Sequence, residues 1–341
     1  MASLNAIAQK LVEPGKGILA ADESEPTIAK RFARIGLPST QELRRDYREM
    51  LFRAREAMTN SISGAILTEE TLLQHAADGT AFRAMLADCD VIPGIKVDKG
   101  TFPMPGDSGE KLTQGLDGLR ERLAHYASLG AGFAKWRGVI TISASAPTRN
   151  NIRANAHALA RYAILCQEAG IVPVVEPEVI GDGEPGDHSI DRCEEVTGET
   201  LEAVFQELRL AGVELSGMLL KPNMVLPGTK AKQKASVEEV ARRTVDTMLS
   251  FVPAAVPGIA FLSGGQSDEE ATAHLSAMNS FEGLPWRLTF SYGRALQNAA
   301  LLLWQGRPEN IKIAQAAFTH RAHMNALASL GQWQPELDKA A

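Results

Sequence analysis

Short apolar runs alternate with longer amphipathic segments along the whole chain. Each apolar run is short enough for one strand that is buried on both of its faces. The eight runs are Gly17–Ala21, Ser63–Leu67, Val91–Val97, Phe133–Ile142, Ile171–Val175, Ser216–Leu220, Gly258–Leu262 and Arg287–Phe290. Strands of this kind are typical of a parallel sheet that is covered by helices.

The segments between these runs carry apolar positions at helical spacing. The predicted helices are Thr40–Met58, Leu116–Leu129, Asn150–Ala169, Glu199–Ala211, Val237–Phe251, Asp268–Met278 and Glu309–Leu330. Three capping boxes support their starts, because a serine and a glutamate three residues later satisfy backbone N–H groups of a first turn. The three pairs are Ser39 with Glu42, Ser236 with Glu239, and Ser267 with Glu270.

Repeated alternation of strand and helix, without a break in composition, predicts one α/β domain. We expect a single (β/α)8 TIM barrel over residues 1–330, with an N-terminal helical extension at residues 1–11. Residues 331–341 show no periodicity and predict a short, mobile C-terminal tail. The alternative is an open, doubly wound sheet, which predicts a glycine-rich fingerprint after the first strand. This chain has Ala20-Ala21-Asp22-Glu23-Ser24 there instead.

Composition narrows the class of partner. The net charge of −6 argues against a nucleic-acid-binding protein, and it means that an anionic substrate must be attracted by local cations. No segment approaches the ~20 apolar residues of a membrane span, so we expect no membrane partner. The three cysteines match no metal or redox motif, and the N-terminus is too polar for a signal peptide. A cytoplasmic location fits best.

Charged residues gather where the predicted strands end. In a (β/α)8 barrel the carboxyl ends of the strands form the active site. Alternation along a strand puts Lys135 and Arg137 on one face, and likewise Glu176 and Glu178. A lone lysine at a strand end is usually solvated, but this many buried charges cost several kcal/mol per ion unless they pair. The pattern therefore favours a functional site, which also includes Asp22, Lys96 and Lys221.

Two glycine turns follow the last two strands. Ser263-Gly264-Gly265 and Ser291-Tyr292-Gly293-Arg294 lie where this fold commonly binds phosphate. Glycines let backbone N–H groups approach an anion, and the arginine adds a bidentate donor. The plainer interpretation is that these glycines only make tight turns, but two such turns on adjacent strands favour phosphate.

The sequence shows no metal-binding motif, and lysine is the one residue type in it that suggests covalent catalysis. The seven histidines include none at the end of a predicted strand and no His-x-x-x-His spacing, so we expect no metal and no other cofactor. There is no Gly-x-Ser-x-Gly elbow and no cysteine nucleophile motif. Lysine is therefore the candidate nucleophile. Lys221 follows three apolar residues, whereas Lys135, two residues before Arg137, is expected in a cationic, phosphate-facing environment.

Seven motifs resemble the class I fructose-bisphosphate aldolases in order along the chain. They are GKGILAADES (15–24), GIKVDKG (94–100), FAKWR (133–137), VEPE (175–178), LLKPNMV (219–225), FLSGGQS (261–267) and SYGRALQ (291–297). The likeness runs from about residue 4 to about residue 330 and covers seven of the eight predicted strands.

The resemblance implies a role for each matching residue. Lys221 matches the Schiff-base lysine, Glu176 the main acid/base residue, Glu178 its neighbour, Lys135 the second lysine, and Asp22 the carboxylate that assists carbon–carbon cleavage. Residues matching one phosphate site are Ser263, Gly264, Ser291, Gly293 and Arg294. Residues matching the other end of the sugar are Ser24, Lys96 and Arg137, with Thr27 where many relatives have serine.

The implied activity is reversible, metal-independent cleavage of fructose 1,6-bisphosphate to dihydroxyacetone phosphate and glyceraldehyde 3-phosphate in glycolysis and gluconeogenesis. A homotetramer is the family expectation. Alternatives are another lysine-dependent barrel enzyme, such as a deoxyribose-phosphate aldolase or a transaldolase, and a catalytically silent scaffold. A departure from the family is the absence of a terminal tyrosine, because no tyrosine follows Tyr292. Another group must then handle the proton of the enamine intermediate.

Overall fold

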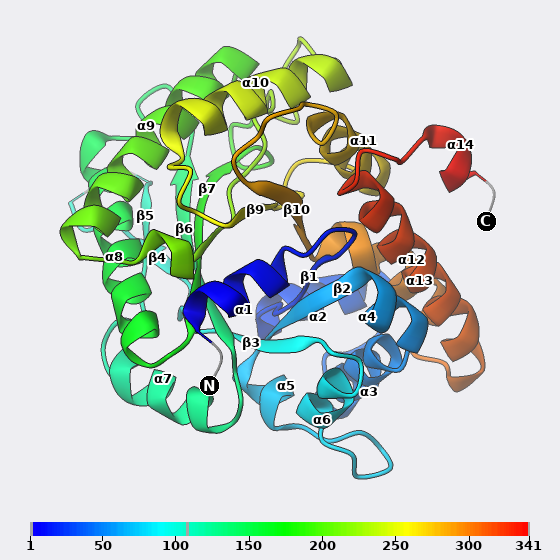
Figure 1. The fold of residues 1–341 in the computed structure, drawn as a ribbon. Helices are drawn as coiled ribbons and strands as arrows, with labels where there is room; N and C mark the ends of the chain where they lie inside the picture. Colours follow the sequence, from blue (N-terminus) through cyan, green and yellow to red (C-terminus); the bar gives the residue numbers. More distant parts are fainter. Residues whose placement is uncertain (1–2, 107–108, 340–341) are drawn as a thin grey trace.

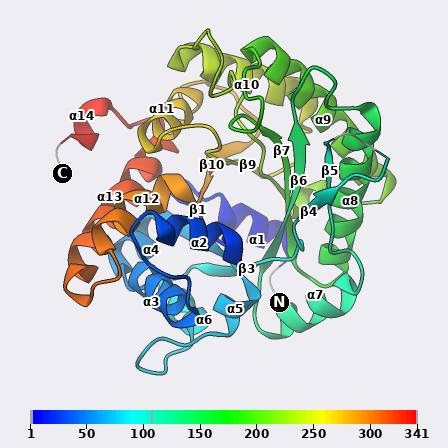
Figure 2. The ribbon, with the colours of Figure 1, turned by 180° about the vertical axis from the view of Figure 1, so that it is seen from behind.

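Eight parallel strands close into a barrel. The computed structural model describes residues 3–106 and 109–339, and its barrel has the strand order β1-β10-β9-β8-β7-β6-β3-β2. Figure 1 shows it from the end covered by α1, and Figure 2 from the opposite end. The strands are β1 (Gly17–Ala21), β2 (Ile62–Leu67), β3 (Ile92–Lys96), β6 (Phe133–Thr141), β7 (Val172–Ile180), β8 (Leu219–Leu220), β9 (Gly258–Phe261) and β10 (Arg287–Tyr292).

All eight predicted strands are confirmed, and the open-sheet alternative is wrong. The first and last strands pair directly, with Ile18 opposite Ser291, and that pairing closes the barrel. Strand β7 extends past the predicted end at Val175 because it stays paired with β6 as far as Ile180. Strand β8 is short, but the backbone N–H of Lys221 still donates to the Val175 carbonyl at 2.8 Å.

Helices surround the barrel, as the alternating pattern predicted. They are α1 (Leu4–Leu11), α2 (Glu25–Ala33), α3 (Gln41–Phe52), α4 (Arg55–Ser61), α5 (Glu69–Leu73), α6 (Phe82–Ala87), α7 (Leu119–Ser128), α8 (Arg149–Glu168), α9 (Ile190–Leu210), α10 (Val237–Phe251), α11 (Asp268–Met278), α12 (Arg294–Trp304), α13 (Ile311–Ala328) and α14 (Pro335–Asp338). A small hairpin, β4 (Thr101–Pro103) and β5 (Lys111–Thr113), flanks the barrel.

Several helix boundaries differ from the sequence prediction. The predicted helix at residues 40–58 is two helices, α3 and α4, separated at Arg53 and Ala54, because the chain must turn there to enter β2. Helix α9 begins at Ile190, nine residues before the predicted start at Glu199. Its cap is Ser189, whose side chain accepts the N–H of Arg192 in the first turn. The short helices α2, α5, α6 and α12 were not predicted.

One of the three predicted capping boxes is present in full. The side chains of Ser267 and Glu270 bond each other's backbone N–H groups at the start of α11. Ser236 caps α10 by accepting from the Glu239 N–H, while the Glu239 carboxylate pairs with Arg243. The predicted capping box of Ser39 and Glu42 is wrong, because the residue that caps α3 is Thr40. The start signals were therefore accurate to one residue.

The N-terminal helical extension is confirmed for residues 4–11, which form α1 and cover one end of the barrel, while residues 1 and 2 lie outside the described residues. Ala8 and Leu11 of α1 pack into a buried cluster with residues of the strands, including Ile66, Phe133 and Leu219. No helix within the described residues is both long and apolar enough to cross a membrane.

The C-terminal tail contains a short helix that its sequence did not predict. Residues 335–338 form the short helix α14, which lies at the periphery of the molecule, outside the ring of helices (Figures 1 and 2). The Asp338 carboxylate lies 3.0 Å from Nε2 of His320, accepts the Trp333 indole N–H at 3.0 Å and also pairs with Arg321. Asp338 therefore joins this part of the tail to α13, and the mobility of the tail stays a prediction. Residues 340 and 341 of the predicted tail lie outside the described residues.

Candidate active site

A cavity of about 980 Å³ opens at the carboxyl ends of the strands. Thirteen charged side chains line it, seven of them lysine or arginine and six aspartate or glutamate. It brings together all fourteen site residues named from the sequence: Asp22, Ser24, Thr27, Lys96, Lys135, Arg137, Glu176, Glu178, Lys221, Ser263, Gly264, Ser291, Gly293 and Arg294. A local excess of cations suits an anionic substrate on a chain of negative net charge.

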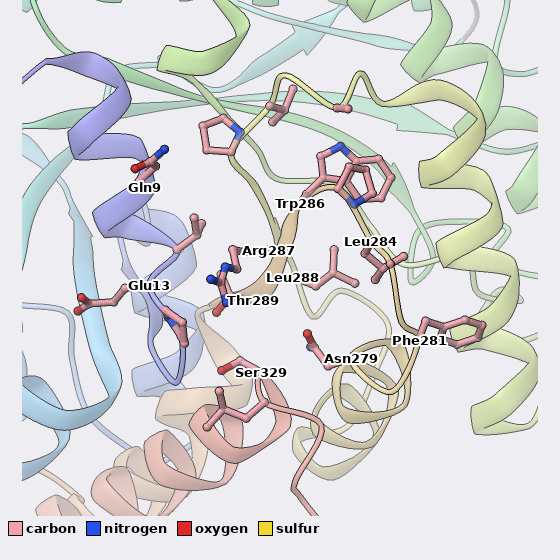
Figure 3. Close-up of a pocket in the computed structure, with 18 of the residues that line it drawn as sticks. Gln9, Glu13, Asn279, Phe281, Leu284, Trp286, Arg287, Leu288, Thr289 and Ser329 are labelled. Atoms are coloured by element: carbon pink, nitrogen blue, oxygen red, sulfur yellow. The ribbon is translucent and has the colours of Figure 1, made fainter.

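A second cavity, of about 890 Å³, lies at the opposite ends of β9 and β10. Figure 3 shows its lining, in which Glu13 and Arg287 are the charged residues and Trp286, Leu284 and Phe281 form much of the wall. Buried charges that shift one another's protonation mark catalytic sites more often than apolar walls do. The cavity at the carboxyl ends is therefore the candidate active site.

At the centre of the active-site cavity, two lysines share one carboxylate. The Lys221 ammonium nitrogen lies 3.0 Å from Glu176 Oε1, and the Lys135 nitrogen lies 3.1 Å from Glu176 Oε2. Lys135 also lies 2.6 Å from Asp22 Oδ2. At most a tenth of each of these four side chains is exposed. The four groups come from β6, β7 and the residues that follow β1 and β8, so they meet only when the barrel closes.

The surroundings of Lys135 differ from the prediction. A cationic, phosphate-facing environment was expected from its nearness to Arg137, but its ammonium group contacts two carboxylates. Asp22 reaches it across the inside of the barrel, and local spacing along β6 does not reveal such a contact. The expectation was therefore wrong.

The pKa values of this cluster follow from burial and charge. Burial alone would raise the pKa of Asp22, but the ammonium groups of Lys135 and Lys221 outweigh it and hold that pKa far below its usual range. The same two lysines, against the same burial, lower the pKa of Glu176. Burial opposes the charge of Lys135, but Asp22 and Glu176 outweigh it and raise its pKa well above that of an ordinary lysine. At neutral pH both carboxylates are therefore ionised and Lys135 is a cation.

A second charged pair lies beside this cluster. Arg137 of β6 pairs with Glu178 of β7. The Glu178 carboxylate, aided by Glu176 and opposed by burial, raises the pKa of the guanidinium. A β-carbon at Gly264 would stand 3.0 Å from Glu178 Oε1, so a larger residue there would crowd the carboxylate. Glycine at this position lets the turn after β9 come close to the site.

The end of β10 and the turn that follows it present hydrogen-bond donors to the cavity. Gly293 precedes α12 and has no side chain to cap its first N–H groups, which leaves them available to an anion. The Ser291 hydroxyl, 1% exposed, has no hydrogen-bond partner within the described residues. The Arg294 guanidinium donates to the Gln266 carbonyl at 2.8 Å, at the edge of the cavity. This geometry suits a phosphate group.

Sequence reasoning assigned no role to five charged residues of the lining: Glu23, Arg31, Asp98, Lys99 and Asp182. Glu23 pairs with Arg31 and with the buried Arg48. A β-carbon on Gly293 would stand 3.5 Å from an Arg31 nitrogen, so Arg31 lies beside the turn after β10. Helix α2 was not predicted, so nothing pointed to Arg31. Asp98 lies two residues after Lys96, and alternation along β3 could have identified it.

No metal-binding cluster accompanies these residues. In residues 3–106 and 109–339, the side chains of His, Cys, Asp and Glu form no group of three or more that could hold a metal ion.

Comparison with known proteins gives consistent matches along the whole chain. A family model described as "Glycolytic: Fructose-bisphosphate aldolase class-I" matches residues 3–341. A probable fructose-bisphosphate aldolase class 1 of Xanthomonas campestris pv. campestris is 54% identical over 328 residues, covering 96% of this chain and 97% of the relative. Fructose-bisphosphate aldolase B of Gallus gallus is 51% identical over 332 residues, which cover 97% of this chain and 90% of the relative.

A solved structure agrees with the sequence matches. It is the ternary complex of fructose-bisphosphate aldolase from Plasmodium falciparum with TRAP and a small-molecule inhibitor. That aldolase is 48% identical in sequence and superposes with a TM-score of 0.93, over 97% of this chain and 95% of its own.

Proposed function

The chain belongs to the class-I fructose-bisphosphate aldolase family, and we propose that its catalytic nucleophile is Lys221, which forms a Schiff base with the substrate. The chain is accordingly a carbon–carbon lyase, which replaces the alternatives of a transaldolase, a deoxyribose-phosphate aldolase and a silent scaffold. Its reaction is the reversible cleavage of fructose 1,6-bisphosphate to dihydroxyacetone phosphate and glyceraldehyde 3-phosphate. The contact of Lys221 with Glu176 is the observation that carries the proposed role.

Glu176 acts first as a proton carrier. An amine must be unprotonated to attack a carbonyl, and the Glu176 carboxylate lies 3.0 Å from the Lys221 nitrogen. Transfer of one proton from Lys221 to Glu176 leaves a neutral amine, which adds to C2 of the sugar. Glu176 then returns the proton to the C2 hydroxyl of the adduct, which leaves as water. The product is a protonated imine on Lys221, and Glu176 is again a carboxylate.

The protonated imine accepts the electrons of the C3–C4 bond. Glu176, now a base, takes the proton of the C4 hydroxyl, while Asp22 and Lys135 hold that hydroxyl in place by hydrogen bonding and charge. Glyceraldehyde 3-phosphate leaves, and an enamine remains on Lys221. Protonation of the enamine at C3 and addition of water then release dihydroxyacetone phosphate and the amine. Because α14 does not line the cavity, the proton for C3 comes from a cavity residue, and Glu176 is the nearest acid to Lys221.

The order of strands supports a position for each phosphate. C1 is next to the carbon that binds Lys221, so its phosphate lies near β8, the adjacent strand β9, and β10 on the far side of β9. Ser263, Gly264, Ser291, Gly293 and Arg294 are the residues that bind it. C6 is four carbons from C2, and its phosphate reaches Lys96 of β3 and Arg137 of β6, with Ser24 and Thr27 at the rim. Glu178 holds Arg137 in this position.

The remaining parts of the proposal come from the family. We propose that catalysis needs no metal ion or other cofactor, and that the protein works as a homotetramer in the cytoplasm.

Borohydride trapping tests the nucleophile. Fructose 1,6-bisphosphate and borohydride should attach a sugar phosphate to Lys221 and to no other lysine, as mapped by peptide mass spectrometry. Lys221→Ala should abolish the label, while Lys135→Ala should slow turnover strongly and retain some label. A label on Lys135, or a label that persists in Lys221→Ala, would overturn the assignment.

A further inference from the structure

Lys96 has a carboxylate partner to which the proposed mechanism gives no role. Its ammonium nitrogen lies 2.5 Å from Asp98 Oδ1 and 2.8 Å from the Asp98 carbonyl oxygen. The Asp98 side chain is 4% exposed, and that of Lys96 is 18% exposed. Both residues line the active-site cavity. The cation that is expected to bind the far phosphate is therefore already paired.

The backbone fixes the position of the Asp98 carboxylate independently of Lys96. Its Oδ1 atom accepts the N–H of Gly100 at 3.1 Å, and its Oδ2 atom accepts the N–H of Arg137 at 3.4 Å. These donors belong to the loop after β3 and to β6. Lys96 has a flexible side chain, whereas the carboxylate is held from two elements. A phosphate that binds Lys96 must therefore draw it from Asp98 or share it with Asp98.

Charge makes this sharing unfavourable. A phosphate oxygen bonded to the Lys96 nitrogen would stand within roughly 5 Å of Asp98 Oδ1, on the other side of the nitrogen. At that distance in a mostly buried site, the negative phosphate and carboxylate repel each other. Lys96 and Asp98 together carry no net charge when they are paired. The phosphate therefore gains less binding free energy from this pair than it would from an unpaired lysine.

We propose that Asp98 competes with the C6 phosphate for Lys96 and so limits the affinity of the cavity for that end of the sugar. The inference rests on the proposed binding of the C6 phosphate by Lys96. Competition weakens the hold on glyceraldehyde 3-phosphate, the product that leaves first, and speeds its release. It also sets how strongly the enzyme prefers fructose 1,6-bisphosphate over fructose 1-phosphate, which lacks the C6 phosphate.

Asp98→Asn tests the proposal, because asparagine has the same shape and can still accept the Gly100 N–H but has no charge. Lys96 then has no carboxylate partner, and the phosphate interacts with the full positive charge of the ammonium group. The KM for fructose 1,6-bisphosphate should fall about five- to tenfold, and the inhibition constant of glyceraldehyde 3-phosphate should fall similarly. The KM for fructose 1-phosphate and the inhibition constant of dihydroxyacetone phosphate should stay within about twofold. Asp98→Ser is a second variant, should Asp98→Asn fold poorly, and should shift the same constants.

Two controls separate this inference from the proposed function. Asp90→Asn breaks the exposed pair of Asp90 with Lys10, far from the cavity, and should change none of these constants. Lys96→Ala should raise the KM for the bisphosphate and not that for the monophosphate; if it does not, the placement of the C6 phosphate is wrong. If Lys96→Ala behaves as expected but Asp98→Asn raises or leaves unchanged the KM for the bisphosphate, Asp98 orients Lys96 and does not compete for it. Equal shifts for both substrates would also overturn the competition.

Discussion

Replacing Lys135 with methionine should destabilise the protein in a way that depends on pH. The side chain of Lys135 is 5% exposed and is the cation that contacts both Asp22 and Glu176. Methionine fills a similar volume, so a cavity contributes little to the effect. Removing one partner of a buried ion pair costs about 3–5 kcal/mol, because it leaves a buried charge uncompensated. Glu176 keeps Lys221, but Asp22 loses the contact at 2.6 Å. We expect a loss of about 3 kcal/mol in the free energy of unfolding at neutral pH.

The pH dependence follows from the direction of each pKa shift. In the wild-type protein, burial alone would raise the pKa of Asp22, but the charges of Lys135 and Lys221 outweigh burial and hold this pKa below its usual value. That depressed pKa contributes stability above the unfolded value of about 4, and the contribution is lost only as pH falls through the folded pKa. The raised pKa of Lys135 contributes stability throughout the acidic and neutral range. Without Lys135, burial is opposed only by Lys221 and Lys96, so the pKa of Asp22 rises from its wild-type value. The carboxyl then takes up a proton as pH falls from neutral, and the loss of stability shrinks.

Urea denaturation at neutral pH and at pH ~5 measures both the loss of stability and its dependence on pH. The difference in stability between wild type and Lys135→Met should be largest at neutral pH and clearly smaller at the acidic pH. Lys10→Met is the matched control, because it breaks an exposed pair with Asp90 and should cost under about 1 kcal/mol at both pH values. A loss of under about 1 kcal/mol in Lys135→Met, or a loss that grows as pH falls, would refute the reasoning.

Three further outcomes are expected. Arg294→Ala should raise the KM for fructose 1,6-bisphosphate about thirtyfold, the scale of a lost charged hydrogen-bond pair of about 2 kcal/mol; an unchanged KM in steady-state assays would place the phosphate elsewhere. Truncation after Gln332 removes the contacts of Asp338 with Arg321 and should lower the Tm, while kcat stays within about threefold. A folded truncated enzyme that loses about a hundredfold in kcat would instead give the tail a catalytic role. Treatment with EDTA should leave the cleavage rate unchanged, and a loss that zinc restores would contradict the metal-free mechanism.

The sequence alone determined the barrel and fourteen of the residues that line its cavity. Each strand is a short apolar run, so its limits are visible locally, and strand β9 was predicted to within one residue. Parallel strands in a closed barrel place their carboxyl ends at one mouth. Residues as distant along the chain as Asp22 and Arg294 could therefore be assigned to one site before any contact was known.

The tertiary structure decided which of these charges meet. Asp22 follows β1 and Lys135 lies on β6, two strands that β2 and β3 separate in the barrel. Their contact depends on strand tilt and side-chain reach, which no local periodicity encodes. The same holds for Asp338, whose contact with Arg321 joins a tail without a periodic pattern to α13. Asp98 is an intermediate case, because alternation places it beside Lys96, but only the fold supplies the Arg137 N–H that fixes its carboxylate. Spacing along a strand reports on which face a residue lies, whereas the partner of a buried charge is set by the closure of the whole barrel.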